Sequence, residues 1–277
     1  MKVLANDGIS KSGIEALEKG GFEVITTTVA QEQLANYINE KQISVLLVRS
    51  ATTVRKDLID ACPSIKIIGR GGVGMDNIDV DYAKSKGLHV INTPASSSHS
   101  VAELVFGHFY GLARFLHNSN RDMPLEGDAN FGKLKKAYAK GTELKGKTLG
   151  VLGFGRIGQA TAKVALGAGM KVIAFDPFLE KANLELDFFD GQKVNFEIKT
   201  ISKEEVLKQS DFITLHVPAQ KDYVIGAPEF EIMKKGVFIA NAARGGVINE
   251  VALVKAIESG KVAGAALDVF ENEPKPE

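Results

Sequence analysis

The first hundred residues alternate short apolar runs with longer segments in which apolar residues recur every three or four positions. Such runs are typical of buried strands, and the longer segments indicate amphipathic helices. Strands are predicted at residues 3–7, 22–26, 45–50, 65–69 and 88–94, and helices at 10–21, 29–41, 53–62 and 79–87. Because strands separated by helices pair in parallel, we predict a doubly wound α/β domain at residues 1–97, flavodoxin-like in strand order.

A second alternating series follows a long helix predicted at residues 96–123 and a lysine-rich loop predicted at 132–147. Its strands are predicted at 149–154, 171–177, 211–218, 237–242 and 262–270, with helices between them and a variable stretch before Lys203. Residues 98–277 are therefore predicted to form a second doubly wound parallel-sheet domain, of the Rossmann type. Two domains suit 277 residues better than the alternative of one large sheet, and we expect a ligand in the cleft between them.

Composition narrows the classes of partner. Lys plus Arg and Asp plus Glu both total 34, so the net charge is zero, which argues against nucleic acid or an acidic membrane surface as the main partner. Small anionic ligands remain possible. The one cysteine, Cys62, allows no intrachain disulfide, and no apolar run approaches the roughly 20 residues of a membrane helix. We expect a cytoplasmic protein without a metal site.

Two stretches match the dinucleotide-binding pattern G-x-G-x-x-G, and their surroundings separate them. The second copy comprises Gly153, Gly155, Arg156, Ile157 and Gly158. It continues directly into a predicted helix, whose first amides would face a diphosphate. Asp176 follows the next strand, 18 residues beyond Gly158 (176 − 158), where a carboxylate would bind the adenosine ribose and repel a 2′-phosphate. This copy predicts binding of NAD in preference to NADP.

The first copy, at residues 69–74, lacks both features. Five residues separate it from a plausible helix cap, and the neutral Asn92 stands where the acid would be. Its glycines are expected instead to expose a nest of backbone N–H groups that binds a small anion such as a carboxylate. The nest would involve Gly72, Val73 and Gly74. A simple tight turn is the alternative.

Polar groups also follow three later strands, at the edge where open α/β sheets bind ligands. Arg244, in NAARGG, is placed to bind a carboxylate through two parallel hydrogen bonds, with a surface salt bridge as the alternative. His216 is either an ordinary strand-end residue or part of an adenine pocket. Asp268 and Glu273 would, on their own, be expected to be solvated.

Taken together, these stretches resemble one family. They are similar to the D-isomer-specific 2-hydroxyacid dehydrogenases, and the similarity spans nearly the whole chain. The matching stretches are GRGGVGMDNID, NTPASSSHSVAEL, GFGRIG with FDP, LHVP, NAARGGVIN and AALDVFENEP. VRSAT, at residues 48–52, resembles the D-3-phosphoglycerate dehydrogenase branch. The resemblance implies hydride transfer between NAD and carbon 2 of a small anionic 2-hydroxy or 2-keto acid.

The resemblance also implies roles for single residues. Arg244 would bind the carboxylate and carbonyl oxygens of the substrate. Glu273 would pair with a catalytic histidine and raise its pKa, so that the histidine acts as an acid near neutral pH. Asp268 would reach the nicotinamide amide. Beyond the glycines, the expected cofactor contacts are Val73, Arg156, Ile157, Asp176, His216, Val217, Pro218, Ala242, Ala243, Arg244 and Asp268.

One feature of the family is not found in these residues. The catalytic histidine is expected in a Pro-His pair beyond the acid, and the sequence ends four residues after Glu273. His89, His99, His108, His117 and His216 do not occupy that place. We therefore expect the chain to be part of a longer protein, and the residues given to bind NAD but to transfer hydride poorly.

Phosphoglycerate needs cations at its phosphate as well as at its carboxylate. Arg49, at the end of the third strand, and Arg70, beside the glycine nest, are the candidates, although exposed arginines are often only solvated. The predicted reaction is oxidation of 3-phosphoglycerate to 3-phosphohydroxypyruvate, which feeds serine synthesis. A glyoxylate or hydroxypyruvate reductase is the alternative within the family. An NAD-sensing protein similar to the transcriptional corepressors of this fold is the alternative outside enzymes.

A homodimer is expected, because members of the family commonly pair around the long helix. The apolar residues available on this helix are Val101, Leu104, Val105 and Phe109. The same face could equally belong to the core.

Overall fold

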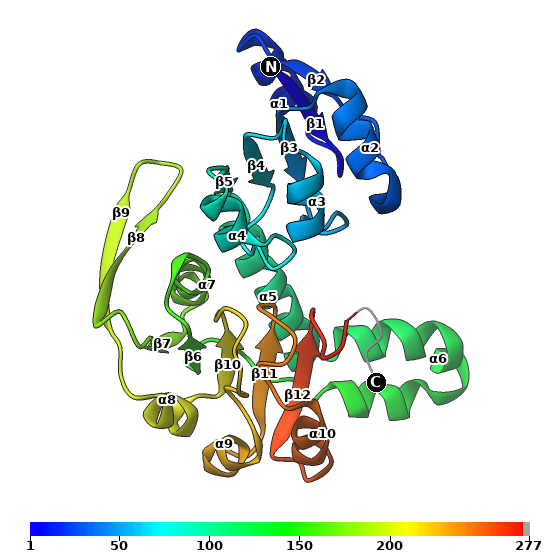
Figure 1. The fold of residues 1–277 in the computed structure, drawn as a ribbon. Coiled ribbons are helices and arrows are strands. Elements are labelled where there is room, and N and C mark those ends of the chain that lie inside the picture. Colours follow the sequence, from blue (N-terminus) through cyan, green and yellow to red (C-terminus); the bar gives the residue numbers. More distant parts are fainter. Residues whose placement is uncertain (274–277) are drawn as a thin grey trace. The chain divides into compact units, whose positions relative to one another are not determined.

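The computed structural model describes residues 1–273, and the chain divides into two compact units, Met1–Ser97 and Ser98–Glu277 (Figure 1). Each unit has its own parallel sheet connected by helices, so the predicted α/β class is confirmed. No helix within the described residues is long and apolar enough to cross a membrane.

The first unit is a doubly wound sheet of five parallel strands. Its strands are β1 (Lys2–Ala5), β2 (Glu23–Ile25), β3 (Val45–Val48), β4 (Ile67–Arg70) and β5 (His89–Asn92), and its helices are α1 (Lys11–Lys19), α2 (Gln31–Lys41), α3 (Lys56–Ala61) and α4 (Val80–Ser85). The spatial order β2-β1-β3-β4-β5 is the predicted flavodoxin-like order. All of β3 and the last three residues of β1 are apolar because helices cover both faces of such a sheet.

The second unit contains a five-stranded parallel sheet of the Rossmann type. Its strands are β6 (Thr148–Leu152), β7 (Lys171–Phe175), β10 (Phe212–Leu215), β11 (Val237–Asn241) and β12 (Val262–Leu267). Its helices are α5 (Ser98–Ala113), α6 (Leu116–Tyr138), α7 (Arg156–Gly167), α8 (Lys203–Gln209), α9 (Ala227–Ile232) and α10 (Glu250–Glu258). The order β12-β11-β10-β6-β7 reverses direction between β6 and β10, and ligands of open α/β sheets bind beyond the carboxyl ends of the strands at such a point.

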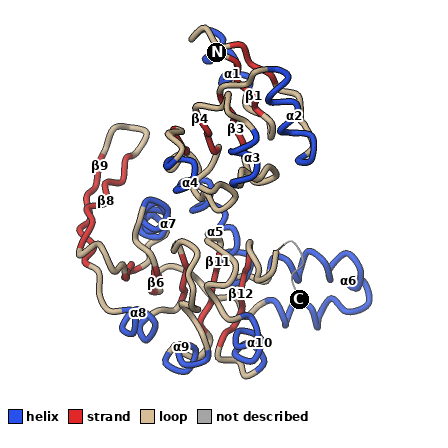
Figure 2. Tube along the Cα trace, in the orientation of Figure 1, coloured by secondary structure: helices blue, strands red, loops and turns tan. Residues whose placement is uncertain are grey.

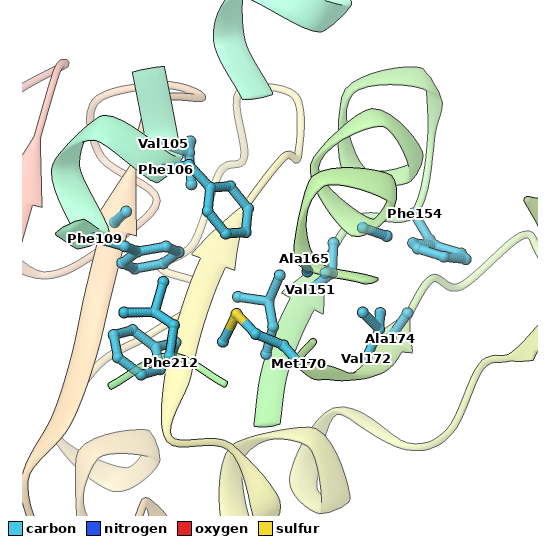
Figure 3. Packing of buried hydrophobic residues seen from close by; sticks show 14 of the residues in the cluster. Val105, Phe106, Phe109, Val151, Phe154, Ala165, Met170, Val172, Ala174 and Phe212 are labelled. Atoms are coloured by element: carbon cyan, nitrogen blue, oxygen red, sulfur yellow. The ribbon is translucent and has the colours of Figure 1, made fainter. Parts of the chain in front are cut away.

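Helix α5 packs its apolar face against this sheet. Phe109 is fully buried and meets Phe212 of β10 edge-on, with ring centroids 5.2 Å apart (Figure 3). Phe212 also stacks on Phe238, with ring centroids 4.9 Å apart. Val105 is buried in the same cluster, whereas Leu104 is 39% exposed. Two of the four residues considered for a dimer face are therefore committed to the core of their own unit.

The helix and loop predicted at residues 96–147 differ from those observed. The first helix ends at Ala113, because Phe115 adopts a left-handed conformation with φ of 55°. Helix α6 then runs to Tyr138 with a break at Asn130, so the prediction of a loop beginning at residue 132 was wrong. Leu134 explains the error, since its buried side chain makes this lysine-rich segment amphipathic.

The variable stretch before Lys203 contains a hairpin that was not predicted. Strands β8 (Lys181–Asp187) and β9 (Lys193–Lys199) pair antiparallel and project from the second unit (Figure 2). Its apolar residues alternate strictly, as they do in a half-buried hairpin. They are Ala182, Leu184 and Leu186 on β8, and Val194, Phe196 and Ile198 on β9.

Candidate functional site

The turn between β6 and α7 shows why three glycines are needed. Gly153 has φ of +90°, and a Cβ there would lie 2.5 Å from the carbonyl oxygen of His216. A Cβ on Gly158 would lie 2.2 Å from the carbonyl oxygen of Gly153. A Cβ on Gly155, in contrast, would meet no atom within 4 Å. Two glycines therefore allow backbone segments to pack, and the third leaves open space at the turn.

Helix α7 begins immediately after this open position. Gly155 is its N-cap, and no side chain caps the first turn. The first amides of the helix are thus available to an anion, and the positive end of the helix dipole points the same way. The open space at Gly155 leaves room for the diphosphate that is expected at the second glycine motif.

Asp176 lies beside the same turn, directly after β7. Its Oδ2 accepts a hydrogen bond from the amide of Phe154 (2.8 Å), and its Oδ1 accepts one from the amide of Phe178 (2.9 Å). These bonds fix the carboxylate next to the glycine turn, and each oxygen retains capacity for a further bond. The fixed carboxylate can accept the two hydroxyls of an adenosine ribose.

The ring of His216 lies beneath the turn. Its Nε2 is 3.1 Å from the hydroxyl of Thr214 and 3.2 Å from that of Thr161, which itself donates to the carbonyl of Ile157. Burial lowers the pKa of His216 to about 4, so the ring is neutral at physiological pH. His216 therefore connects β10 to the first turn of α7 and does not exchange protons near neutral pH. Its neighbour Val217 packs against Gly153.

The loop after β11 is held by Asn241, a residue that the sequence analysis missed. Its side chain, 3% exposed, donates to the carbonyl of Arg244 (2.9 Å) and accepts from the amide of Ala243 (3.1 Å). The main-chain carbonyl of Asn241 accepts a hydrogen bond from the amide of Asp268, which follows β12 (2.9 Å). The available signal was a polar residue ending the apolar run VFIAN.

Arg244 is thereby fixed at the carboxyl edge of the sheet. Its Nη1 donates to the carbonyl of Ala243 (2.7 Å), and the side chain is half-buried. A Cβ on Gly245 would lie 1.9 Å from the carbonyl oxygen of Phe270, so the loops after β11 and β12 touch through their backbones. Glu273, on the second of these loops, is exposed and its Oε1 accepts from the amide of Phe270 (2.7 Å).

The first glycine motif is organised differently from the second. Helix α4 begins at Val80, well beyond the motif, so these glycines do not open a helix, as predicted. The amide of Gly71 donates to Val48 (2.9 Å), and that of Gly72 donates to Arg70 (2.9 Å). The amide of Gly72 is therefore used within the turn and is not exposed as predicted, whereas anion binding at Val73 and Gly74 stays a prediction. The carbonyl of Val73 accepts from the side chain of Asn92 (2.7 Å).

Arg49 stands on a loop that the side chains of Asp7 and Asn77 hold through hydrogen bonds to its backbone. Asp7 Oδ2 accepts from the amides of Arg49 (2.6 Å) and Thr52 (3.1 Å). The side chain of Asn77 donates to the carbonyls of the same two residues, at 2.7 and 2.6 Å. Buried Asn6 donates to the Thr52 hydroxyl (2.8 Å). None of the three supporting residues was predicted from the sequence, although Asn6 and Asp7 directly follow the apolar run of β1.

Similarity to known proteins agrees with this geometry. The sequence profile of the NAD-binding domain of D-isomer-specific 2-hydroxyacid dehydrogenases matches residues 106–277. The chain belongs to this family. It is 43% identical to a hydroxypyruvate reductase of Thermotoga maritima, over 99% of this chain and 84% of that protein. It is 41% identical to a D-3-phosphoglycerate dehydrogenase of Methanocaldococcus jannaschii, over 99% of this chain but about half of that protein (50%).

Solved structures of the family have the same fold. A glyoxylate reductase from Paecilomyes thermophila, 30% identical, superposes with a TM-score of 0.79, covering 100% of this chain and 83% of that one. A D-lactate dehydrogenase from Aquifex aeolicus in complex with NAD and lactic acid, 31% identical, superposes with a TM-score of 0.73, covering 99% and 78%.

NAD is the cofactor of this dehydrogenase, and the second unit fits it on its own geometry. The open position at Gly155 and the uncapped start of α7 suit the diphosphate, and the fixed carboxylate of Asp176 suits the ribose. Within this unit the sheet topology places Arg156, Asp176, His216, Arg244 and Asp268 after the carboxyl ends of its strands. The remaining predicted contacts in the unit follow the same strands and are Val217, Pro218, Ala242 and Ala243.

Proposed function

We propose that the protein oxidises 3-phosphoglycerate to 3-phosphohydroxypyruvate with NAD and so feeds serine synthesis. The observation that carries this proposal is the placement of two arginines in the first unit. Arg49 follows β3 and Arg70 is the last residue of the adjacent parallel strand β4, and a Cβ on Gly71 would lie 3.5 Å from Arg49 Cγ. Two guanidinium groups at one sheet edge suit a phosphate, which binds arginine through paired hydrogen bonds.

The residues of the chain divide the work of this reaction. NAD, when bound, accepts hydride from carbon 2 of the hydroxy acid. Arg244 binds the substrate carboxylate and the oxygen that becomes the carbonyl, and Asp268 holds the nicotinamide amide. Asp7, Asn77 and Asn241 are positioning residues, since they fix the loops on which the arginines stand.

The hydroxyl proton needs a separate acceptor. By family resemblance this is a histidine paired with Glu273, whose carboxylate raises the pKa of the imidazole. None of the five histidines in residues 1–277 stands at that place in the sequence. His216 is excluded by its burial, because it stays neutral and is held by two threonine hydroxyls.

The substrate is tested on the full-length protein with an NAD-coupled assay. Replacing Arg49 with Ala is expected to raise KM for 3-phosphoglycerate about 10- to 100-fold, the effect of losing a charge-assisted contact worth roughly 1.5–3 kcal/mol. KM for hydroxypyruvate, which has no phosphate, should not change. Arg55→Ala is the matched control, because Arg55 is an exposed arginine of the same unit that pairs with Asp79 at 3.0 Å. Equal KM changes for both substrates would reject a phosphate site.

A hydroxypyruvate or glyoxylate reductase is the second candidate. It is supported by the 43% identity to the Thermotoga maritima enzyme, which slightly exceeds the identity to the phosphoglycerate dehydrogenases. Turnover of hydroxypyruvate or glyoxylate without turnover of 3-phosphoglycerate would establish this candidate. Tight NADH binding without turnover of any hydroxy acid would instead favour an NAD-sensing protein.

We also propose a cytoplasmic homodimer built on α5 and α6. Apolar side chains remain exposed on both helices although Val105 and Phe109 are buried in the core. They are Leu104, Tyr110, Leu116, Leu125 and Phe131, exposed by 39 to 76%. Replacing Leu125 with Glu should halve the mass of the assembly in light scattering, and an unchanged mass would reject this face.

A further inference from the structure

The hairpin of β8 and β9 is a two-stranded sheet with an outer edge on each strand. The outer edge of β9 is joined to β7 just beyond its end, where Thr200 bridges to Ala174. Among residues 1–273, no strand pairs with the outer edge of β8. A strand of seven residues without proline therefore presents a row of unpaired backbone groups, which is the usual template for adding another strand.

The pairing pattern shows which residues offer these groups. The bonds from Phe188 N to Gln192 O and from Thr200 N to Glu180 O belong to the same ladder. Hydrogen-bonded pairs alternate along an antiparallel ladder, so even-numbered residues of β8 bond to β9. The backbone groups of the odd-numbered residues point to the free edge. These residues are Lys181, Asn183, Glu185 and Asp187.

We propose that β8 pairs antiparallel with β8 of a second copy of this chain, about a two-fold axis at Leu184. In this register Lys181 lies opposite Asp187 of the second copy, and Asn183 lies opposite Glu185. All four belong to the odd-numbered set, so each pair can exchange two backbone hydrogen bonds, about eight in total. The Lys181–Asp187 pairs are oppositely charged, and both copies use the same surface, as two-fold symmetry requires.

Neighbouring registers are worse. A shift of two residues toward the tip puts Glu185 opposite Glu185, and like charges directly opposite destabilise a sheet. A shift the other way leaves Asp187 outside the paired segment. The proposed register uses the whole strand.

The exposed aromatic residues at both ends of β8 support the same axis. Phe189, at the tip, is fully exposed at 105%, and Phe178, before the base of the strand, is 96% exposed. Counted from Leu184, Phe189 is five residues ahead and Phe178 six behind (189 − 184 and 184 − 178). The two-fold axis therefore brings the tip of each copy to the base of the other, so that the exposed Phe189 of one copy and Phe178 of the other come to the same region.

The pairing also reaches the cofactor site. The amide of Phe178 is the group that Asp176 Oδ1 accepts from, at 2.9 Å. Covering Phe178 would order this segment, and the carboxylate that binds the ribose is part of it. NAD affinity should therefore rise with protein concentration through the range in which the copies associate.

Proline substitution tests the edge. Asn183→Pro removes an outward N–H without removing a bond to β9, and Asn195→Pro makes the same change on the outer edge of β9. In sedimentation equilibrium of the full-length protein, Asn183→Pro should weaken this self-association about tenfold or more, because both copies lose a bond. Asn195→Pro should leave it unchanged. Equal association of both variants and the parent protein would overturn the proposal.

Disulfide trapping tests the register. The two-fold axis brings residue 183 of one copy opposite residue 185 of the other, at a Cα separation of about 5.5 Å, which a disulfide spans. The Asn183→Cys/Glu185→Cys variant should form covalent dimers on mild oxidation, and the buried native Cys62 should contribute no background. The matched Asn195→Cys/Glu197→Cys variant on β9 should stay monomeric on a denaturing gel. Cross-linking of the β9 variant alone, or of neither variant, would contradict the β8 pairing.

Discussion

Replacing Gly155 with Ala separates cofactor binding from folding. Its φ of −71° is accessible to alanine, and the added Cβ meets no atom within 4 Å. The free energy of unfolding should therefore change by no more than about 1 kcal/mol. The methyl group would occupy the space through which the diphosphate reaches the amides of α7. Losing one or two charge-assisted bonds of roughly 1.5–3 kcal/mol each should weaken NAD binding at least tenfold.

Calorimetric titration with NAD and a thermal melt of the same samples measure both effects. Gly167→Ala is the matched control, because this glycine lies at the other end of α7 and an added Cβ also meets no atom within 4 Å. It should leave NAD affinity unchanged and should not lower the melting temperature, because alanine is favoured over glycine in a helix. If Gly155→Ala binds NAD as tightly as the Gly167→Ala control, the reasoning about this turn is refuted.

Three further predictions concern the supporting residues. Asn241→Ala should lower kcat more than it raises KM for NAD, because it releases the Arg244 loop; an unchanged kcat in steady-state assays would contradict this role. Asn77→Ala should raise KM for the hydroxy acid several-fold without changing NAD affinity measured by calorimetry, because it frees the Arg49 loop. The pKa of His216 is about 4 in the folded protein and 6.5 in the unfolded chain, so the unfolded chain binds the proton first as pH falls. Stability is therefore lost as pH falls from 6.5 to 4, by about 2 kcal/mol at pH 5. Urea unfolding of His216→Gln should lose that part of the pH dependence, and an unaltered dependence would show that another group is responsible.

The sheets and the cofactor turn could be predicted from local sequence pattern. Alternating periods identify strands and helices, and the distance from each glycine motif to the next helix distinguishes Gly155 from the first motif. The carboxylate at residue 176 follows from its position after the next strand. These features depend on residues close together in the chain, so the sequence displays them directly.

The supports of the arginine loops could not be predicted in the same way. Asp7 and Asn77 meet at Arg49 because they follow β1 and β4, which are the two neighbours of β3 in the sheet although they are far apart in the chain. The hairpin at 181–199 was missed for another reason. Its period-two alternation is present in the sequence, but its polar half is dense with charge and was interpreted as a variable stretch.

The cofactor site itself is tested most directly by titrating the full-length protein with NAD and with NADP, in parallel with Asp176→Ala. A carboxylate fixed by the amides of Phe154 and Phe178 should bind the ribose hydroxyls of NAD and repel the 2′-phosphate of NADP. The parent protein is therefore expected to bind NAD more tightly than NADP, and the variant to lose affinity for NAD and discriminate less. Equal affinity of the parent protein for the two cofactors would contradict the account.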